Sequence, residues 1–204
     1  MNTLMTFGQD AAWRRIVADT LEPVGPGASV LDVGTGTGRL AQAVLDRDSS
    51  AHVVGVDFTY GMLHEAPQHL HLAAADALRL PFSDQQFDAV VSGFVVRNLA
   101  DVRTGLAEQV RVLTPGGLLL ILETTPGPGG ILRPFYRLYF RYVVPMLGRL
   151  IAGDPSAYTY LPESTLAFLE PSRLAELMRD SGLRGVQTRP LMLGCVAITL
   201  GRKA

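Results

Sequence analysis

The stretch Val30–Gly38, with the sequence VLDVGTGTG, constrains the fold more than any other part of the chain. Apolar residues on both sides of Asp32 predict a buried parallel strand, and the glycines that follow predict a tight turn. A helical pattern begins directly afterwards, at Arg39. A strand, a glycine turn and a helix in this order form a ligand-binding crevice at the carboxyl end of a parallel sheet.

The rest of the chain repeats this alternation of strands and helices. Strands are predicted at residues 29–33, 52–57, 70–75, 87–91, 118–122, 185–189 and 195–200. Helices are predicted at residues 39–46, 60–70, 101–113 and 171–181, and a turn at residues 114–117. We therefore expect an α/β fold, with a mostly parallel seven-stranded sheet and helices on both faces.

At 204 residues the chain has the length of one domain, which we expect to span residues 1–204. Within it, residues 24–125 form the predicted ligand-binding core. The strand rhythm is lost after a stretch rich in Pro and Gly, so residues 126–170 are expected to form a helical insertion after the fifth strand. Residues 171–204 are the predicted C-terminal helix and strand pair.

Composition excludes several classes of protein. The formal net charge of −1 argues against nucleic-acid binding, and a hydrophobic share of 48% argues against disorder. A single cysteine excludes an intramolecular disulfide and fits a reducing compartment, so we expect a cytoplasmic protein. The four histidines and the cysteine show no metal-ligand spacing, and no metal is expected.

The spacing of the glycines separates two classes of nucleotide-like cofactor. Dinucleotide-binding turns follow G-x-G-x-x-G, whose third glycine allows close packing of helix and strand. Counted from Gly34, that third position is Arg39, and the glycines follow G-x-G-x-G instead, with Asp32 two residues before them. This pattern resembles motif I of class I S-adenosylmethionine-dependent methyltransferases. The resemblance implies a Rossmann-like fold and S-adenosylmethionine as the cofactor.

The resemblance also assigns roles at the ends of the first three strands. Asp32 would receive the ammonium of the methionyl portion, directly or through water. Asp57 would accept both ribose hydroxyls, and Asp76 with Ala77 would contact the adenine. Glycines at the turn would let the backbone approach the cofactor. The remaining expected cofactor contacts are Gly34, Thr35, Gly36, Thr37, Gly38, Phe58, Met62, Ser92 and Gly93. For any single acid, capping of the next helix stays an alternative.

Further segments resemble one family within this class. They are Trp13–Arg15, Leu80–Phe82, Arg97–Asn98, Arg111–Gly117 and Tyr158–Ser164. The last, YTYLPES, is similar to the Y-x-Y-L-x-E-S signature of the ubiquinone/menaquinone biosynthesis C-methyltransferases. The resemblance implies methylation of a ring carbon of a polyprenyl hydroquinone, such as demethylmenaquinol or a ubiquinone precursor.

This reaction needs a group that favours the phenolate form of the acceptor. Arg97 and Asn98, just past the fourth strand, are the predicted catalytic residues, although anchoring of a loop is an alternative. Tyr158, Tyr160 and Glu163 are the predicted contacts of the acceptor, with packing of an inserted lid as the alternative.

The segment at residues 131–151 is apolar enough to contact a membrane. Arg133, Arg137 and Arg141 recur every four residues, which places them on one stripe of a helix and argues against a transmembrane span. The pattern is typical of a helix that lies in a membrane interface or caps a pocket. A core-packing helix or a homodimer contact is an equally open interpretation.

Two rival functions remain at this point. One is a class I methyltransferase for another small lipophilic or phenolic acceptor. The other is a non-catalytic cofactor-binding subunit of a quinone-biosynthesis assembly, because the chain departs from the family pattern at Gly93 and Thr124.

Overall fold

The computed structural model describes residues 8–21, 25–127, 138 and 168–204. The predicted acceptor contacts Tyr158, Tyr160 and Glu163 lie outside the described residues, as does the segment at residues 131–151 apart from Leu138.

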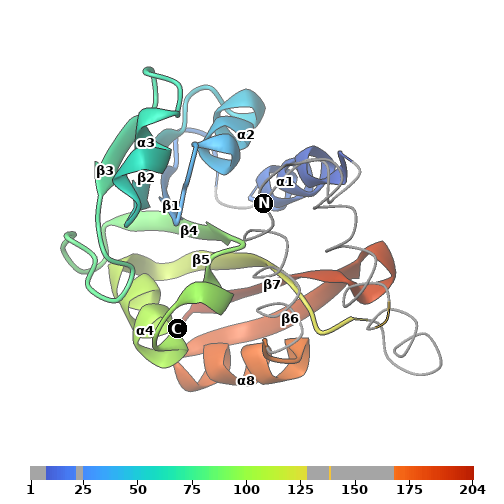
Figure 1. The fold of residues 1–204 in the computed structure, drawn as a ribbon. Coiled ribbons are helices and arrows are strands. Elements are labelled where there is room, and N and C mark those ends of the chain that lie inside the picture. Colours follow the sequence, from blue (N-terminus) through green and yellow to red (C-terminus); the bar gives the residue numbers. More distant parts are fainter. Residues whose placement is uncertain (1–7, 22–24, 128–137, 139–167) are drawn as a thin grey trace.

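Helices and strands alternate along the described chain (Figure 1). The helices are α1 (Gln9–Thr20), α2 (Arg39–Arg47), α3 (Tyr60–His64), α4 (Val102–Val112) and α8 (Pro171–Asp180). The strands are β1 (Ser29–Val33), β2 (His52–Asp57), β3 (His71–Ala74), β4 (Phe87–Gly93), β5 (Leu113–Thr124), β6 (Leu183–Leu191) and β7 (Val196–Lys203). Two short 3-10 helices, η2 (Val96–Asn98) and η5 (Met192–Gly194), follow β4 and β6.

All seven strands form one sheet in the order β3-β2-β1-β4-β5-β7-β6. The strands from β1 to β5 pair in parallel, whereas β7 is antiparallel to both of its neighbours. The predicted mostly parallel, seven-stranded α/β fold is therefore confirmed. The strand order turns back between β1 and β4, which is where parallel sheets of this kind form ligand crevices.

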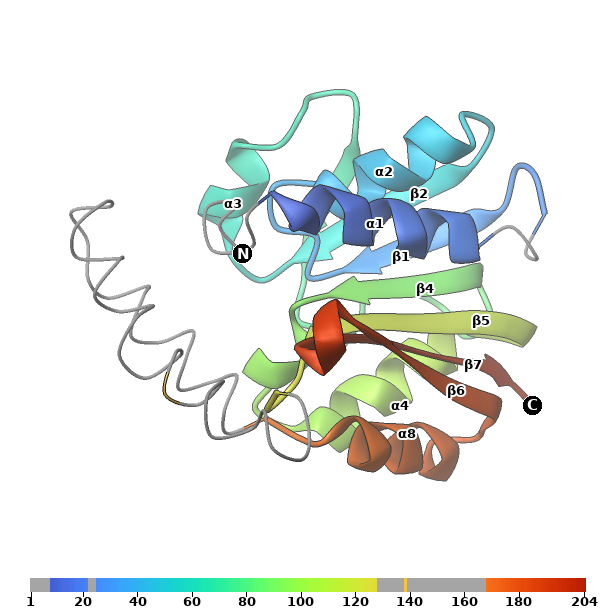
Figure 2. The same cartoon turned by 90° about the vertical axis from the view of Figure 1, so that its right-hand side faces the viewer.

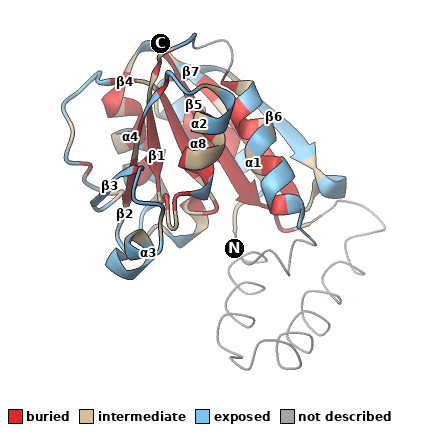
Figure 3. Cartoon of the chain, turned by 90° about the horizontal axis from the view of Figure 1, so that it is seen from above, coloured by how far each residue is buried: buried red, intermediate tan, exposed pale blue. Residues whose placement is uncertain are grey.

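The sheet is buried on both faces because successive residues of its central strands enter different cores. Leu118, Leu120 and Leu122 of β5 join the cluster that also contains residues of α1 and α2. Leu119 and Ile121 join the cluster that contains residues of α4 and α8. Figure 2 shows the helix pairs α1/α2 and α4/α8 on either side of the sheet, and Figure 3 shows the buried strands between them.

Two elements differ from the prediction. The helix expected at residues 60–70 is helical only over Tyr60–His64, because Pro67 has no amide hydrogen and the chain turns there to bring Leu70 under the glycine turn. The turn expected at residues 114–117 is part of β5, where the pairing with β4 shifts register between Phe87 and Ala89. Residues 114–117 thus form an irregularity within the strand.

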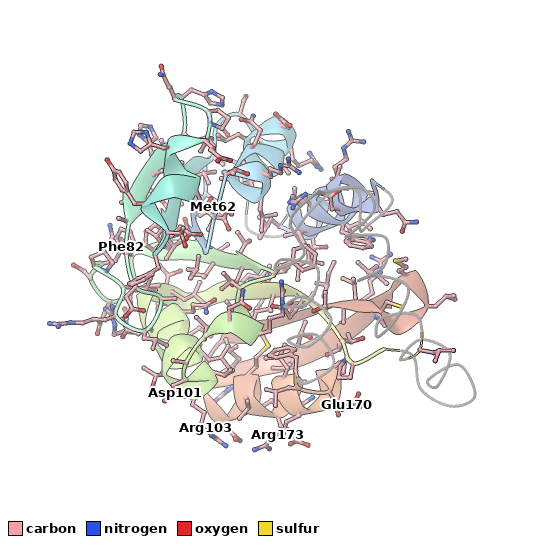
Figure 4. The ribbon with its side chains drawn as sticks, viewed as in Figure 1. Met62, Phe82, Asp101, Arg103, Glu170 and Arg173 are labelled. Atoms are coloured by element: carbon pink, nitrogen blue, oxygen red, sulfur yellow. The ribbon has the colours of Figure 1, made fainter. Side chains whose placement is uncertain are left out.

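Helix α4 begins at a cap that the sequence pattern did not specify. The Asp101 carboxylate accepts hydrogen bonds from the amides of Arg103 and Thr104 (Figure 4). These amides belong to the first turn of the helix and have no hydrogen-bond acceptor within it. The Asp101 carboxylate therefore supplies the acceptor that the helix lacks there. No helix in the described part of the chain has both the length and the apolar character needed to cross a membrane.

The irregular part of β5 generates a prediction for stability. A Cβ atom on Gly117 would lie 2.8 Å from the Thr114 carbonyl oxygen and 3.1 Å from that of Asp88. Backbone atoms cannot move aside cheaply, so we expect Gly117→Ala to lower the free energy of unfolding by about 1–3 kcal/mol in urea titrations. Gly61→Ala in α3 is the matched control, because its Cβ would meet nothing within 4 Å. Equal stability of the two variants would contradict this description of β5.

Candidate active site

A cavity of about 960 Å³ opens at the carboxyl ends of β1, β2 and β4. These strand ends lie toward the left in Figure 2. It is lined by the loops that follow these strands and β3, at the position where the strand order turns back. Most residues predicted for the site line this one cavity: Asp32, Gly34, Thr35, Gly36, Thr37, Asp57, Phe58, Met62, Asp76, Ala77, Gly93, Arg97 and Asn98.

Two predicted cofactor contacts, Ser92 and Gly38, do not line the cavity. Ser92 is fully buried in β4, and its hydroxyl donates to the Val33 carbonyl at 3.2 Å. Gly38 is buried behind the turn, and a Cβ atom there would lie 2.3 Å from Leu70 Cδ1. Both residues therefore support the walls of this cavity from behind, and their direct contact with a cofactor stays a prediction.

Each of the three positions Gly34, Gly36 and Gly38 requires a glycine for a different physical reason. A Cβ atom on Gly34 would lie 1.9 Å from Cγ2 of Val95, so the space beside Gly34 is filled by the loop after β4. Gly36 faces the cavity, where a Cβ atom would meet only Met62 Cε at 3.5 Å. Figure 4 labels Met62 on α3. All three glycines have positive φ, at 71°, 57° and 76° in chain order. Close approach of a ligand is thus available at Gly36, whereas Gly34 and Gly38 allow the protein to pack against itself.

Asp32 is a fully buried acid at the end of β1. Its Oδ2 accepts hydrogen bonds from the Thr35 hydroxyl at 2.7 Å and the Ala41 amide at 3.1 Å, while Oδ1 has no partner among the described residues. Burial raises the pKa of Asp32 to about 6, and these two hydrogen bonds limit the increase. An unsatisfied carboxylate oxygen beside a cavity fits a cationic group of a ligand, reached directly or through water.

Asp57 ties the end of β2 to the glycine turn. Its Oδ2 accepts from the Gly36 amide and its Oδ1 from the Thr59 amide, both at 2.8 Å. Each carboxylate oxygen can accept further hydrogen bonds, so this geometry leaves capacity for the two hydroxyls of a ribose. Phe58, the next residue, is 81% exposed and offers a flat apolar surface at the rim of the same cavity.

The far wall of the cavity carries a buried ion pair that sequence reasoning missed. Arg97 of η2 donates through Nη1 to Oε1 of Glu123, the second-last residue of β5, and the two side chains are 6% and 3% exposed. The Arg97 amide also donates to Glu123, at 3.3 Å. One signal in the sequence could have indicated Glu123: it directly follows the apolar run at residues 118–122. Asp32 and Asp57 are likewise acids at the ends of strands. Arg97 is therefore a fixed cation in the wall.

Two further contacts set the environment of Arg97. Its guanidinium carbon lies 5.9 Å from the centre of the Phe94 ring, within range of a cation–π interaction. Phe94 has a positive φ of 61°, unusual for a residue with a side chain, and its ring lies 6.2 Å from that of Trp13. The Nε of Arg97 is buried and has no hydrogen-bond partner in the described part of the chain. That N–H is a donor available to a bound oxygen atom.

The loop after β3 closes the remaining side. Asp76 Oδ1 accepts from the Leu78 amide at 2.8 Å, which fixes the loop while the carboxylate stays exposed beside Ala77. Among the described residues, no group of three or more His, Cys, Asp or Glu side chains is arranged to hold a metal ion.

The raised pKa of Asp32 generates a prediction with a defined sign. Because its folded-state pKa of about 6 exceeds the ordinary value of 3.8, Asp32 takes up a proton on folding between these values, and its contribution to stability falls as pH rises through that window. Asp32→Asn should therefore gain stability relative to the wild type between pH 4 and pH 7, by up to about 3 kcal/mol.

Urea unfolding of both proteins at several pH values measures this difference. Asp101→Asn is a control of opposite sign, because hydrogen bonds from the Thr104 hydroxyl and amide lower the pKa of Asp101, so that its stabilisation is lost as pH falls. Parallel stability curves for Asp32→Asn and the wild type would contradict the assigned environment.

Comparisons with known proteins agree with this geometry. A demethylmenaquinone methyltransferase of Deinococcus radiodurans is 44% identical over 210 residues, which cover 100% of this chain and 86% of that protein. The ubiquinone/menaquinone biosynthesis C-methyltransferase UbiE of Desulfotalea psychrophila is 43% identical over 208 residues, covering 100% of this chain and 84% of the relative.

The fold is shared with solved structures of much lower identity. A SAM-dependent methyltransferase from Thermotoga maritima superposes with a TM-score of 0.70 at 18% identity, over 99% of this chain and 93% of that one. This likeness shows the fold of class I methyltransferases. The sequence model of the ubiE/COQ5 methyltransferase family matches residues 1–203. By this match and by relatives of such identity, the chain belongs to the ubiE/COQ5 methyltransferase family.

Proposed function

We propose that this protein transfers the methyl group of S-adenosylmethionine to a ring carbon of a polyprenyl hydroquinone in quinone biosynthesis. The observation that carries the proposal is that one cavity contains both the open side of Gly36 and the buried cation of Arg97. The open space beside Gly36 suits a cofactor with an amino-acid end. The cation of Arg97 suits an acceptor that reacts as an oxyanion. The names of the relatives support a quinol as that acceptor.

The cofactor half of the site is assigned from the donors and acceptors that face it. Asp57 accepts the ribose hydroxyls, Asp76 and Ala77 border the adenine, and Asp32 balances the ammonium of the methionyl portion. When bound, S-adenosylmethionine supplies a methyl group on a sulfonium, which is sufficiently electrophilic without a metal. Transfer forms a carbon–carbon bond, breaks the sulfur–carbon bond and releases the ring proton.

Arg97 acts on the acceptor. The ring carbon becomes a strong nucleophile when the neighbouring hydroxyl loses its proton, and a fixed guanidinium beside the oxygen favours the phenolate. In this proposal the Nε–H of Arg97, which is buried without a partner among the described residues, donates to that oxygen, while Nη1 is held by Glu123. The guanidinium has donors and no acceptor, so its role is electrostatic and not that of a base. Asn98 lines the same wall.

Variants of the Arg97–Glu123 ion pair can distinguish a loss of activity from a loss of stability. Arg97→Ala should lower kcat by about 10²–10³-fold with a smaller change in the KM for S-adenosylmethionine, because it removes a donor that stabilises developing charge. It also leaves Glu123 as a buried unpaired carboxylate, which destabilises the protein. The double variant Arg97→Met/Glu123→Gln removes both charges and should recover stability without recovering kcat. Wild-type kcat in the double variant would remove Arg97 from the mechanism.

The proposed reaction is tested by anaerobic turnover of the full chain with methyl-labelled S-adenosylmethionine. Demethylmenaquinol and a methyl-acceptor precursor of ubiquinone are offered separately, and label in the extracted quinone is expected with at least one of them. Label only in other phenolic acceptors would favour a different small-molecule methyltransferase. Cofactor binding without transfer to any acceptor would favour the non-catalytic subunit.

Contacts to the acceptor from Tyr158, Tyr160 and Glu163 remain part of this proposal, as does membrane association through residues 131–151. A polyprenyl acceptor resides in the bilayer, which gives an apolar interfacial helix a purpose. Co-sedimentation with anionic vesicles tests this association, and a chain that stays in the supernatant would leave lid or homodimer packing for that segment.

A further inference from the structure

The glycine turn has a cationic neighbour that comes from a distant part of the sequence. Arg14, in the middle of α1, lines the cavity together with Asp32, Gly34 and Thr35. Its side chain is 11% exposed, which is unusual for an arginine on the outer layer of an α/β fold. Figure 1 shows that α1 lies beside α2, the helix that begins directly after the glycines.

A buried acid fixes the position of Arg14. Asp10 is 1% exposed, and its Oδ2 lies 2.7 Å from Nη1 of Arg14 and 3.5 Å from Nη1 of Arg39. The three side chains, the Asp10–Arg14–Arg39 cluster, carry one negative and two positive charges. The cluster therefore has a formal charge of +1, beside a cavity whose floor is the acid Asp32. Arg14 also lowers the pKa of Asp32, opposing the effect of burial.

This distribution of charge matches a zwitterion. An α-amino acid presents an ammonium and a carboxylate on the same carbon, so its site needs an acid and a cation close together. Asp32 provides the acid. Arg14 provides the cation, because its planar guanidinium has several donors and one Nη1 contact with Asp10 does not exhaust them.

We propose that Arg14 binds the carboxylate of the methionyl portion of the cofactor, with Asp10 as the residue that positions Arg14. This inference rests on the proposed function for the identity of the cofactor. It assigns a role to α1, which otherwise only covers the sheet.

The other cations at the cavity fit this role less well. Arg39 is 54% exposed, so water competes for its donors and weakens any single contact. Arg97 lies on η2 after β4, away from α1 in the sequence, and the proposed function assigns it to the acceptor. Arg14 combines a largely buried side chain with a place in the cavity lining beside the glycine turn.

Calorimetric titration with two ligands tests the assignment without an acceptor. S-adenosylhomocysteine keeps the amino-acid end of the cofactor, whereas 5′-methylthioadenosine keeps the adenosine and lacks the carboxylate. Arg14→Gln should weaken S-adenosylhomocysteine by at least about tenfold, since a charge-assisted hydrogen bond in a buried site is lost. Its affinity for 5′-methylthioadenosine should stay within about twofold of the wild type.

Arg15→Gln is the matched control. Arg15 is exposed on the next position of α1 and does not line the cavity, so both affinities should equal those of the wild type. Because Arg14→Gln leaves Asp10 buried with one partner fewer, the variant Asp10→Asn/Arg14→Gln provides a second test with no uncompensated acid. It should show the same selective loss.

Three results would overturn the assignment. Equal weakening of both ligands by Arg14→Gln and by the double variant would show a general structural effect. Unchanged affinity for S-adenosylhomocysteine would show that the carboxylate lies elsewhere. A wild-type protein that binds neither ligand would overturn the proposed cofactor together with this inference, whereas intact binding without methyl transfer would affect the proposed function alone.

Discussion

The turn after β1 is held by the end of β2, and the position of the whole site depends on this attachment. The amides of Gly34 and Thr35 donate to the Val56 carbonyl at 2.8 and 2.9 Å, and the Gly36 amide donates to Asp57. The turn therefore cannot move without breaking contacts to a parallel neighbour in the buried centre of the sheet. Val95, packed on the Cα of Gly34, fixes the loop after β4 to the same turn. The walls formed by the loops after β1, β2 and β4 thus share one support.

Charge is distributed over this support in two separate groups. Near the turn, Asp32 and the Asp10–Arg14–Arg39 cluster place opposite charges a short distance apart. On the wall formed by η2 and β5, Arg97 and Glu123 form a buried pair whose cation keeps one donor unused. Burying such groups costs free energy. The proposed binding of a zwitterion near the turn and of an oxyanion near Arg97 would explain why charged groups are buried at these two places.

Much of this arrangement was predictable from the sequence, because alternating apolar strands and acids at strand ends are local patterns. The positions of the strands along the chain, and the acids Asp32, Asp57 and Asp76 at strand ends, followed from such patterns, whereas the order of the strands in the sheet came from the structure. That Gly38 and Ser92 lie outside the cavity lining was not predictable, because the pattern shows which residue type is present and not which side of the turn it faces. Glu123 was missed because it pairs with Arg97, which lies 26 residues away in the sequence. Arg14 was missed because only the packing of α1 against α2 brings it to the glycine turn.

The central claim is that this cavity directs a methyl group to a carbon atom of a quinol ring. The most direct measurement is the position of a deuterated methyl group in the product, determined by mass spectrometry and NMR after anaerobic turnover with S-adenosylmethionine that carries the label. We expect the deuterated methyl group on the ring carbon next to a hydroxyl-bearing carbon. Label on a ring oxygen, or unlabelled quinol after cofactor has been bound, would contradict it.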